Sequence, residues 1–252
     1  DPRDRYEITP LEPFELTPAQ DQVFEVVKQE LAGSAAGRKG KPVLLHGVTG
    51  SGKTEIYLRA IDLALQAGRQ VLMMVPEIAL TPQTVHRVAG RIPGQVGLIH
   101  SRLSDGDRYD TWRRARSGQL KIIVGPRSAL FTPLPNLGLI IIDECHDEHF
   151  YQRDMLPFYS AVEAAIAYAG MTSSLILMGS ATPDVSLYWR AQKEAWHILT
   201  LPDRVLAHRK IIEKHRLETA TPPGRYTLDG DAASLPLPPV RVVDMRDELK
   251  SG

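Results

Sequence analysis

A glycine-rich segment carries the residue types that bind the phosphate groups of a nucleotide. It matches the pattern G-x-x-x-x-G-K-[ST] and reads Gly47-Val48-Thr49-Gly50-Ser51-Gly52-Lys53-Thr54. Glycines let backbone N–H groups surround a phosphate, and a helix that follows adds the partial positive charge of its N-terminus. Lys53 can neutralise phosphate oxygens, and the Thr54 hydroxyl can bind Mg²⁺. The segment therefore predicts a site for a nucleotide and Mg²⁺, to which the backbone of Gly47, Thr49, Gly50, Ser51 and Gly52 contributes.

Two adjacent carboxylates, Asp143 and Glu144, directly follow the apolar run 139–142. Such a run predicts a buried strand, and ligands of open α/β sheets bind at the carboxyl ends of the strands. There Asp143 can hold Mg²⁺ through a water molecule, and Glu144 can orient and deprotonate the water that attacks the γ-phosphate. Solvated acids at an ordinary strand exit are the alternative, and the phosphate-binding segment favours the catalytic interpretation.

The residues from Cys145 to His149 allow a second interpretation, because one cysteine, two histidines and an aspartate are metal-ligand types. Consecutive residues of a regular backbone cannot all face one ion, and the chain has no second cysteine to complete a zinc site. We therefore expect no zinc in this chain. We expect His146 instead to sense the γ-phosphate and to act in catalysis with Lys53, Asp143 and Glu144.

Apolar runs that alternate with amphipathic stretches must position these residues. The expected strands are 43–45, 71–75, 96–99, 122–124, 139–142 and 175–178. The expected helices are 17–33, 53–66, 82–89, 107–116, 158–169 and 184–191. Continuous β-branched runs separated by helices are typical of a parallel sheet that is covered on both faces. The sequence thus predicts an α/β domain of three layers with a mainly parallel central sheet.

The composition narrows the class of protein and of partner. The chain has 252 residues, of which 43% are hydrophobic and 24% charged, as in ordinary globular proteins. Its 30 Lys and Arg balance its 30 Asp and Glu, so any nucleic-acid surface must be local. The single cysteine excludes an intrachain disulfide and fits a reducing cytoplasm. No apolar run approaches the roughly 18 residues of a membrane span, so we expect a cytoplasmic protein without membrane contact.

Asp143-Glu144-Cys145-His146 has the D-E-x-H form of the superfamily 2 nucleic-acid translocases, and further segments resemble one family among them, the primosomal replication-restart DNA helicases. These segments are Pro76-Glu77-Ile78-Ala79-Leu80-Thr81-Pro82-Gln83, Leu98-Ile99-His100-Ser101, Gly125-Pro126-Arg127-Ser128-Ala129-Leu130-Phe131 and Gly179-Ser180-Ala181-Thr182-Pro183. The resemblance covers about residues 14–203. The chain departs from the family at Cys145, where an acidic residue is usual, and near 157–161, where the family has an arginine-containing stretch.

The resemblance implies a RecA-like P-loop NTPase domain, the first of two motor lobes, in an ATP-dependent helicase of replication restart that moves 3′ to 5′ at stalled forks. Within such a lobe Gln20 would read adenine, and Ser180, Ala181 and Thr182 would couple hydrolysis to DNA. The implied partners are single-stranded and forked DNA, primosome-loading proteins and single-stranded DNA-binding protein.

The resemblance also implies that DNA crosses loops at the carboxyl ends of the strands, where N–H groups, hydroxyls and cations hold phosphates. The candidate contacts are Thr81, Gln83, His100, Ser101, Arg127, Ser128, Phe150, Tyr151 and Arg153. The last three belong to an aromatic-rich segment that signals bound DNA to the ATP site in such helicases. Core packing of Phe150 and Tyr151, and a merely solvated Arg127, are the alternatives.

Four regions are expected along the chain: an extended lead-in over 1–16, the RecA-like lobe over 17–203, a basic and then Pro/Gly-rich mobile segment over 204–239, and the start of a missing second lobe over 240–252. The second lobe would carry an arginine finger, which contributes about 10³ to 10⁵ in turnover. We therefore expect the lobe by itself to hydrolyse ATP weakly. Zinc is expected only in other parts of a full-length protein.

Two other functions stay open on the sequence. One is a different superfamily 2 enzyme that acts in repair or on RNA. The other is an ATP-gated DNA-docking module that loads the primosome, with hydrolysis incidental.

Overall fold

The computed structural model describes residues 15–90, 93–208, 227–229 and 232–235. Its centre is a seven-stranded sheet in the order β3-β4-β2-β5-β8-β1-β9, in which every pairing is parallel. The strands are β1 (Val43–Gly47), β2 (Gln70–Met74), β3 (Val96–Leu98), β4 (Ile122–Gly125), β5 (Leu137–Ile142), β8 (Leu175–Ser180) and β9 (His197–Leu201). The predicted parallel α/β fold is confirmed, and all carboxyl ends of these strands meet at one edge.

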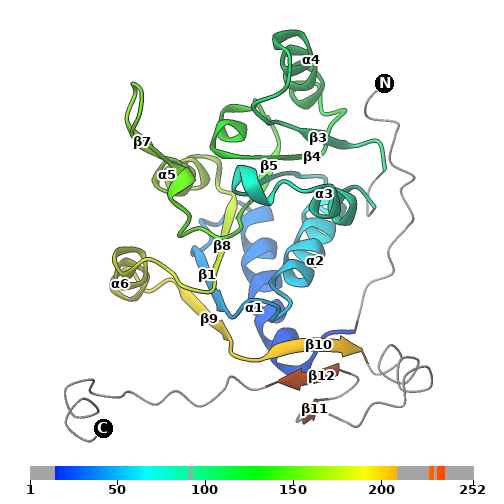
Figure 1. Ribbon diagram of the computed structural model, residues 1–252, viewed down its shortest axis with the longest axis vertical. Helices are drawn as coiled ribbons and strands as arrows, with labels where there is room; N and C mark the ends of the chain where they lie inside the picture. Colours follow the sequence, from blue (N-terminus) through cyan, green and yellow to red (C-terminus); the bar gives the residue numbers. More distant parts are fainter. Residues whose placement is uncertain (1–14, 91–92, 209–226, 230–231, 236–252) are drawn as a thin grey trace, which may run out of the picture.

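Helices cover both faces of this sheet (Figure 1). One face carries α1 (Pro18–Ala35), α2 (Lys53–Gln66) and α3 (Pro82–Ala89), and the other carries α4 (Asp105–Arg116), α5 (Ala161–Thr172) and α6 (Val185–Lys193). The bounds of α2 and α3 are those predicted. The other helices begin and end within about three residues of the predicted positions, which is the usual uncertainty of helix ends.

The strands feed two separate cores because neighbouring residues of a strand point to opposite faces. In β5, Ile140 and Ile142 pack beneath α5 and α6, whereas Leu139 and Ile141 pack beneath α1 and α2. All four side chains are fully buried. A strand that is buried on both faces has no polar side, which is why its sequence is an unbroken apolar run.

Three of the described strands, β9, β6 and β7, were not predicted from the sequence. β9 extends the sheet next to β1 and is only partly buried, so its apolar signal is weak. The short strands β6 (Tyr151–Gln152) and β7 (Tyr159–Ser160) pair antiparallel and form a hairpin that projects from the body of the molecule (Figure 1). The prediction instead began a helix inside this hairpin, at residue 158.

The stretch predicted to be mobile contains regular structure in its described residues. β10 (Arg204–His208), β11 (Thr227–Asp229) and β12 (Ala232–Leu235) form an antiparallel sheet in the order β10-β12-β11. β11 ends at Asp229, and the sequence Asp229-Gly230 is a dipeptide typical of hairpins, which is a signal for this pairing.

The expected lead-in lies almost entirely outside the described residues, and the expected start of a second lobe lies entirely outside them. Within the described part of the chain, no helix combines the length and the apolar character needed to cross a membrane.

Candidate functional site

The strand order sorts the candidate loops into two neighbouring groups along one edge of the sheet. The adjacent strands β5, β8 and β1 precede the loops with residues 143–146, 180–182 and 47–54, which we call the nucleotide half. The adjacent strands β3, β4 and β2 precede the loops with residues 100–102, 126–128 and 76–81. These loops, together with the β6–β7 hairpin, we call the outer half. A ligand bound by one half therefore lies beside a ligand bound by the other.

The phosphate-binding loop has the backbone and the polar groups that its pattern predicts. Gly50 and Gly52 have φ angles of 82° and 86°, a conformation that favours glycine. Lys53 is buried, and its Nζ donates to the Gly47 carbonyl oxygen at 2.7 Å. The Ser51 hydroxyl oxygen is buried with no hydrogen-bond partner. A buried cation and an unsatisfied hydroxyl within a glycine cradle fit a phosphate group.

The space around Gly47 and the position of Thr54 also fit a bound phosphate and its metal ion. A Cβ on Gly47 would lie only 2.6 Å from the Ser51 hydroxyl oxygen, so this position has no room for a side chain. Thr49 is exposed, and Thr54 is half-buried in the first turn of α2. The Thr54 hydroxyl and the Asp143 carboxyl group are oxygen donors of the kind that Mg²⁺ binds.

Gln20 lies against the phosphate-binding loop and uses both ends of its amide within the protein. Its Oε1 accepts from the Thr17 backbone N–H at 3.0 Å, and its own backbone N–H donates to the Thr17 hydroxyl, which forms a capping box at the start of α1. Its Nε2 donates to the Ser51 carbonyl oxygen at 2.9 Å. The amide nitrogen has a second N–H and the amide oxygen a second lone pair, so the predicted contact with adenine is compatible with these bonds. The T-x-x-Q spacing is the sequence signal for the cap.

The backbone after β9 also supports the phosphate-binding loop, and no sequence pattern predicted this. The Val48 N–H donates to the Leu201 carbonyl oxygen at 3.2 Å, and the Val205 N–H donates to the Gly50 carbonyl oxygen at 2.9 Å. Every residue type except proline offers these groups, so such contacts leave no mark in the amino-acid sequence.

Asp143 follows β5 at the carboxyl edge of the sheet, as predicted. Its Oδ1 accepts from the Tyr57 hydroxyl at 3.0 Å and from the Glu144 backbone N–H at 3.1 Å. Burial raises the pKa of Asp143, and the charge of Glu144 raises it further, whereas the Tyr57 bond and Lys53 act in the opposite direction. The site thus holds a half-buried carboxyl group whose charge depends on nearby donors and cations.

Glu144 adopts a backbone conformation that is uncommon for a side chain of this size, with a φ of 49°. One carboxylate oxygen lies 3.8 Å from Lys53 Nζ and the other 3.6 Å from His146 Nδ1. The side chain is one-third exposed, at 33%. Such a strained position between two basic groups fits the predicted role of Glu144 at the reacting phosphate.

Tyr57 belongs to this site although sequence analysis did not select it. It lies in α2, four residues after Lys53, and its ring is fully buried. Burial raises the pKa of Tyr57 well above its usual value, and the charge of Asp143 adds to this, so the phenol stays protonated and donates. The i,i+4 spacing from Lys53 puts both side chains on one face of the helix and is the signal that could have found it.

His146 joins the loops after β5 and β8. Its Nδ1 lies 2.8 Å from the Ser180 hydroxyl oxygen, which also accepts from the Thr182 backbone N–H at 2.9 Å. Either the ring nitrogen or the hydroxyl can donate in this contact, depending on the tautomer of the imidazole. The structure therefore brings His146 together with Ser180 and Thr182, and the half-buried Ala181 lies between them in the chain.

Cys145 points into the core and takes no part in this polar network. It is 2% exposed, and burial raises the pKa of its thiol to about 12, with further contributions from Glu144 and Asp143. Within the described residues, no group of three or more His, Cys, Asp or Glu side chains has a geometry that could hold a metal ion. A small apolar side chain at the x of D-E-x-H is thus accommodated by packing.

In the outer half, most of the predicted contacts are on the surface. Thr81, Ser101 and Ser128 are exposed, and His100 is half-buried. The Ser101 N–H donates to Glu77 Oε1 at 3.0 Å, and hydrogen bonds from Ser101 lower the pKa of Glu77, with smaller effects from nearby basic residues. Glu77 therefore links two of the loops and was missed in the sequence. The side chain of Gln83 lies outside the described part of the structure.

Arg127 holds the base of the β6–β7 hairpin. Its Nη1 donates to the carbonyl oxygens of Tyr151 at 2.9 Å and His149 at 3.3 Å, and its Nη2 lies 3.7 Å from Asp154 Oδ1. The side chain is 28% exposed. Arg127 is thus neither a simple solvated cation nor a group dedicated to phosphate, and it connects the loop after β4 to the chain that follows the catalytic acids.

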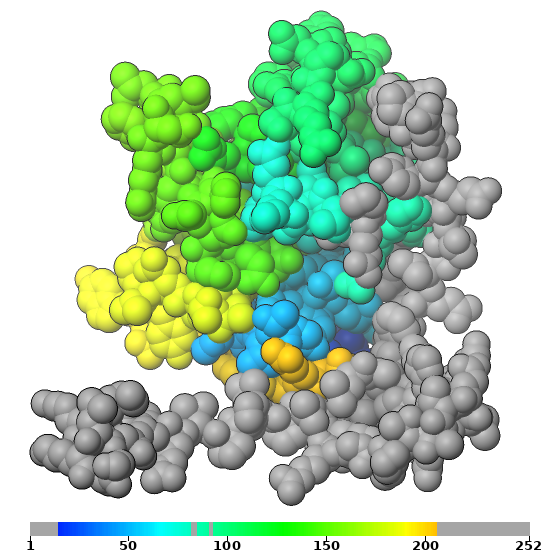
Figure 2. All heavy atoms as spheres, in the orientation of Figure 1, coloured from blue at the N-terminus to red at the C-terminus, as the bar shows by residue number. Residues whose placement is uncertain are grey.

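The structure corrects the prediction that Phe150 contacts DNA. Its ring has no exposed surface and packs in the core, so it offers no face to a base. Tyr151 is half-buried, and the exposed Arg153 places its guanidinium 5.0 Å from the centre of the Tyr151 ring. Apolar side chains are instead exposed at the hairpin tip, where Met155, Leu156 and Phe158 are 59%, 78% and 64% exposed. Figure 2 shows this hairpin as a yellow-green protrusion at the upper left.

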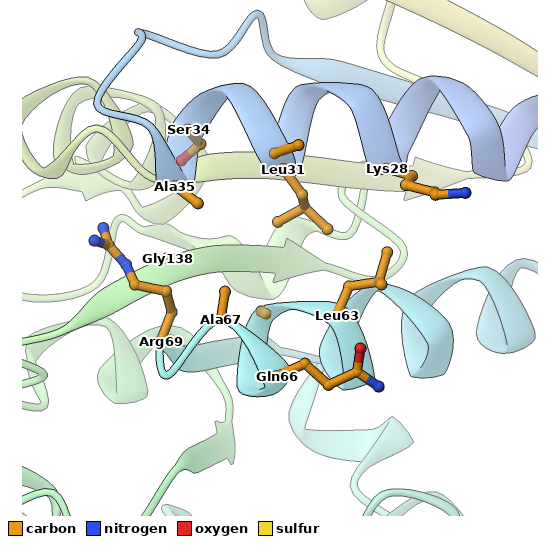
Figure 3. A pocket seen from close by; sticks show the side chains of 11 residues that line it. Lys28, Leu31, Ser34, Ala35, Leu63, Gln66, Ala67, Arg69 and Gly138 are labelled. Atoms are coloured by element: carbon orange, nitrogen blue, oxygen red, sulfur yellow. The ribbon is translucent and has the colours of Figure 1, made fainter.

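A cavity of about 340 Å³ lies elsewhere, between the C-terminal ends of α1 and α2 (Figure 3). Its lining includes Leu31 and Ala35 from α1, Leu63 from α2, and Arg69. Because α2 begins at Lys53 and the cavity is lined by its last turn, the helix separates this cavity from the phosphate-binding loop by about 15 to 20 Å. It is therefore not the nucleotide site.

Comparisons with known proteins agree with this geometry. Residues 17–188 match the family model of the DEAD/DEAH box helicases. The chain is 42% identical over 241 residues to the replication restart protein PriA of Bacillus subtilis (strain 168), covering 96% of this chain and 26% of that protein. It is 44% identical over 238 residues to PriA of Synechocystis sp., covering 94% of this chain and 25% of that protein.

A solved structure of RecG bound to a three-way DNA junction is similar with a TM-score of 0.53 and 25% identity, over 75% of this chain and 24% of that chain. The chain spans about a quarter of the length of the curated relatives it matches. The resemblance to replication-restart helicases that the motifs predicted is confirmed by these similarities.

Proposed function

Because the chain belongs to the DEAD/DEAH box helicase family, we propose that it forms the ATP-binding lobe of a DNA helicase that acts in replication restart. Family membership implies the use of a nucleotide and Mg²⁺. The observation that carries the proposal is the adjacency of the nucleotide half and the outer half at one sheet edge.

In this proposal the nucleotide half binds and hydrolyses ATP. Lys53 and the N–H groups of residues 47–54 would hold the phosphates. Thr54 and Asp143 would hold Mg²⁺, which would supply neutralisation of the phosphate charge. Glu144 takes a proton from the attacking water, since its carboxylate is partly exposed and lies 3.8 Å from Lys53 beside the phosphate-binding loop. Gln20 contacts the base through the remaining hydrogen-bonding capacity of its side-chain amide.

The outer half binds the single-stranded DNA. The exposed side chains of Thr81, Ser101 and Ser128, with the half-buried His100, hold phosphates without reading bases. Tyr151 and Arg153 flank the hairpin base. We add Met155, Leu156 and Phe158 to these contacts in place of Phe150, because exposed apolar side chains can stack on or wedge against unpaired bases.

Coupling between the halves runs through the segment 143–160. Its first residues are the catalytic acids, His146 then contacts Ser180, and the hairpin base is held by Arg127 from the outer half. A displacement of the hairpin by DNA would therefore be transmitted to Glu144 and His146 through a short stretch of backbone.

The restart function, 3′ to 5′ movement and a cytoplasmic location are proposed from the similarity to PriA. Forked DNA is the proposed substrate, since RecG, which was solved on a DNA junction, is also similar. Primosome-loading proteins and single-stranded DNA-binding protein are the proposed partners.

The test is ATP hydrolysis by the full-length protein, measured without nucleic acid, with single-stranded DNA, with RNA and with a branched DNA fork. We expect stimulation by DNA, largest on the fork. It should be lost in Lys53→Ala and retained in Lys39→Ala, a matched change at an exposed lysine.

Each other outcome has a definite meaning. Stimulation by RNA alone would show an RNA helicase. Hydrolysis at the same rate with and without nucleic acid would support the ATP site in the nucleotide half and would overturn the helicase function. Fork binding and primosome loading that survive in Glu144→Gln would favour the ATP-gated docking module.

A further inference from the structure

Tyr57 touches three parts of the nucleotide half. It belongs to α2, which begins at Lys53, and its hydroxyl donates to Asp143 Oδ1 after β5 at 3.0 Å. Its ring end packs against Gly179 in β8. The residue is fully buried, so this hydrogen bond is shielded from water.

Gly179 is the position at which β8 leaves room for the phenol. A Cβ built on Gly179 would overlap the Tyr57 hydroxyl oxygen and would lie 2.9 Å from the ring carbon that carries it. The Gly179 backbone is in turn tied to the catalytic loop, because its carbonyl oxygen accepts from the Cys145 N–H at 2.9 Å. The absence of a side chain at this strand residue is thus explained by the place of the Tyr57 hydroxyl.

The two carboxylate oxygens of Asp143 are used differently. Oδ1 accepts two hydrogen bonds, from Tyr57 and from the Glu144 N–H. No donor among the described residues reaches Oδ2. Because rotation about the last side-chain bond of an aspartate is soft, the two donors to Oδ1 determine which oxygen remains for a ligand.

We propose that the Tyr57 hydroxyl positions Asp143 for Mg²⁺, and that residue 179 is glycine so that this hydroxyl can reach the carboxylate. Tyr57 touches neither the phosphates nor the metal and acts through Asp143, as other hydrogen-bond partners of metal-binding carboxylates do. The inference rests on the proposed function, since it concerns the same nucleotide site.

The experiment measures ADP binding by calorimetry across a range of Mg²⁺ concentrations, for the wild-type chain and for Tyr57→Phe. We expect the Mg²⁺ concentration that gives half of the full effect on ADP affinity to rise about 10-fold in Tyr57→Phe. ADP affinity without Mg²⁺ should be unchanged, because the phosphate-binding loop keeps all its groups. Tyr168→Phe, in the half-buried face of α5, is the matched control and should leave both quantities unchanged.

A second comparison separates positioning from a general loss of structure. Tyr57→Phe is combined with Asp143→Asn, and thermal unfolding of each variant is recorded without ligand. We expect Asp143→Asn to raise the same Mg²⁺ concentration, and Tyr57→Phe to add no further change to it in the double variant. A purely structural hydroxyl would lower the unfolding temperature and leave the Mg²⁺ dependence as it is.

The outcomes separate a failure of the proposed function from a failure of the role of Tyr57. A wild-type chain that binds no ADP with Mg²⁺ present would overturn the proposed function itself. Normal ADP binding with an unchanged Mg²⁺ dependence in Tyr57→Phe would overturn only the role of Tyr57. An additional Mg²⁺ shift in the double variant would also overturn it, because the hydroxyl would then act by another route.

Discussion

The nucleotide half and the outer half occupy the same sheet edge but are built in opposite ways. In the nucleotide half, buried groups such as Lys53 and Tyr57 are already bound within the site, Lys53 to the Gly47 carbonyl oxygen and Tyr57 to Asp143. In the outer half the candidate groups are mostly exposed, with Phe158 at 64% as an example. Chemistry at a phosphate needs donors fixed in place before the reaction, whereas a surface that moves along a polymer must bind many sequences in turn.

The chain from Phe150 to Phe158 crosses between these two designs. Its first residue is anchored in the core, and its tip presents apolar side chains to solvent. This short segment is therefore fixed in the core at Phe150, whereas its tip can contact a ligand from solvent. Substitutions at buried and at exposed positions should therefore have different effects.

The largest effect is expected for Glu144→Gln in the nucleotide half. Losing the proton acceptor should slow ATP hydrolysis about 10²- to 10⁴-fold, while ADP binding and single-stranded DNA affinity stay near wild type. Phosphate release and fluorescence anisotropy measure the two properties. Glu148→Gln, at an exposed position nearby, serves as the control. An equal loss of DNA affinity in Glu144→Gln would show that the halves are not separable.

Phe150→Ala tests where the core ends. Because the ring is fully buried, its removal should lower the free energy of unfolding by about 3–5 kcal/mol. Urea denaturation at neutral pH gives this quantity. Unchanged stability combined with weaker DNA binding would contradict the core position of Phe150 and would indicate that its ring contacts DNA.

Phe158→Ala is the opposite case at the hairpin tip. Its ring is exposed, so stability should be unchanged, and loss of one stacking partner should weaken single-stranded DNA binding by about 1–3 kcal/mol. Anisotropy with a labelled oligonucleotide measures the affinity. Met171→Ala, an exposed apolar residue at the end of α5, should have no effect. The proposal for the tip fails if both variants bind DNA equally well.

The smallest effect is expected for Glu77→Gln, which weakens the contact between two outer loops. Glu77 is largely exposed, so its contribution to stability should stay below about 1 kcal/mol at pH 7. Its pKa is lower in the folded state than in the unfolded chain, so this contribution is present above the unfolded pKa, about 4.3, and is lost as pH falls through the folded pKa. Urea denaturation at pH 7 and below pH 4 should show the difference from wild type shrinking. A difference that grows with acid would contradict this sign.

The parallel fold and most of the helix positions were predictable because their signals are local. An apolar run such as 139–142 and an N-cap such as Thr17 act within a few residues of themselves. The short hairpin and β9 were not predictable in this way. Their residues are only partly buried, and their pairing depends on neighbours that are brought close by the rest of the fold.

The main features of the nucleotide half could be predicted from the amino-acid sequence alone. Successive backbone N–H groups hold a phosphate, so the loop that binds it is one contiguous motif. The tertiary structure determined which partners and which burial the individual side chains have. It joined Tyr57 to Asp143 across 86 positions, turned Arg127 toward the hairpin, and buried Phe150 while exposing Phe158. Partners that are distant in the chain leave no mark in its spacing, and the burial of an aromatic ring depends on the surfaces that pack against it.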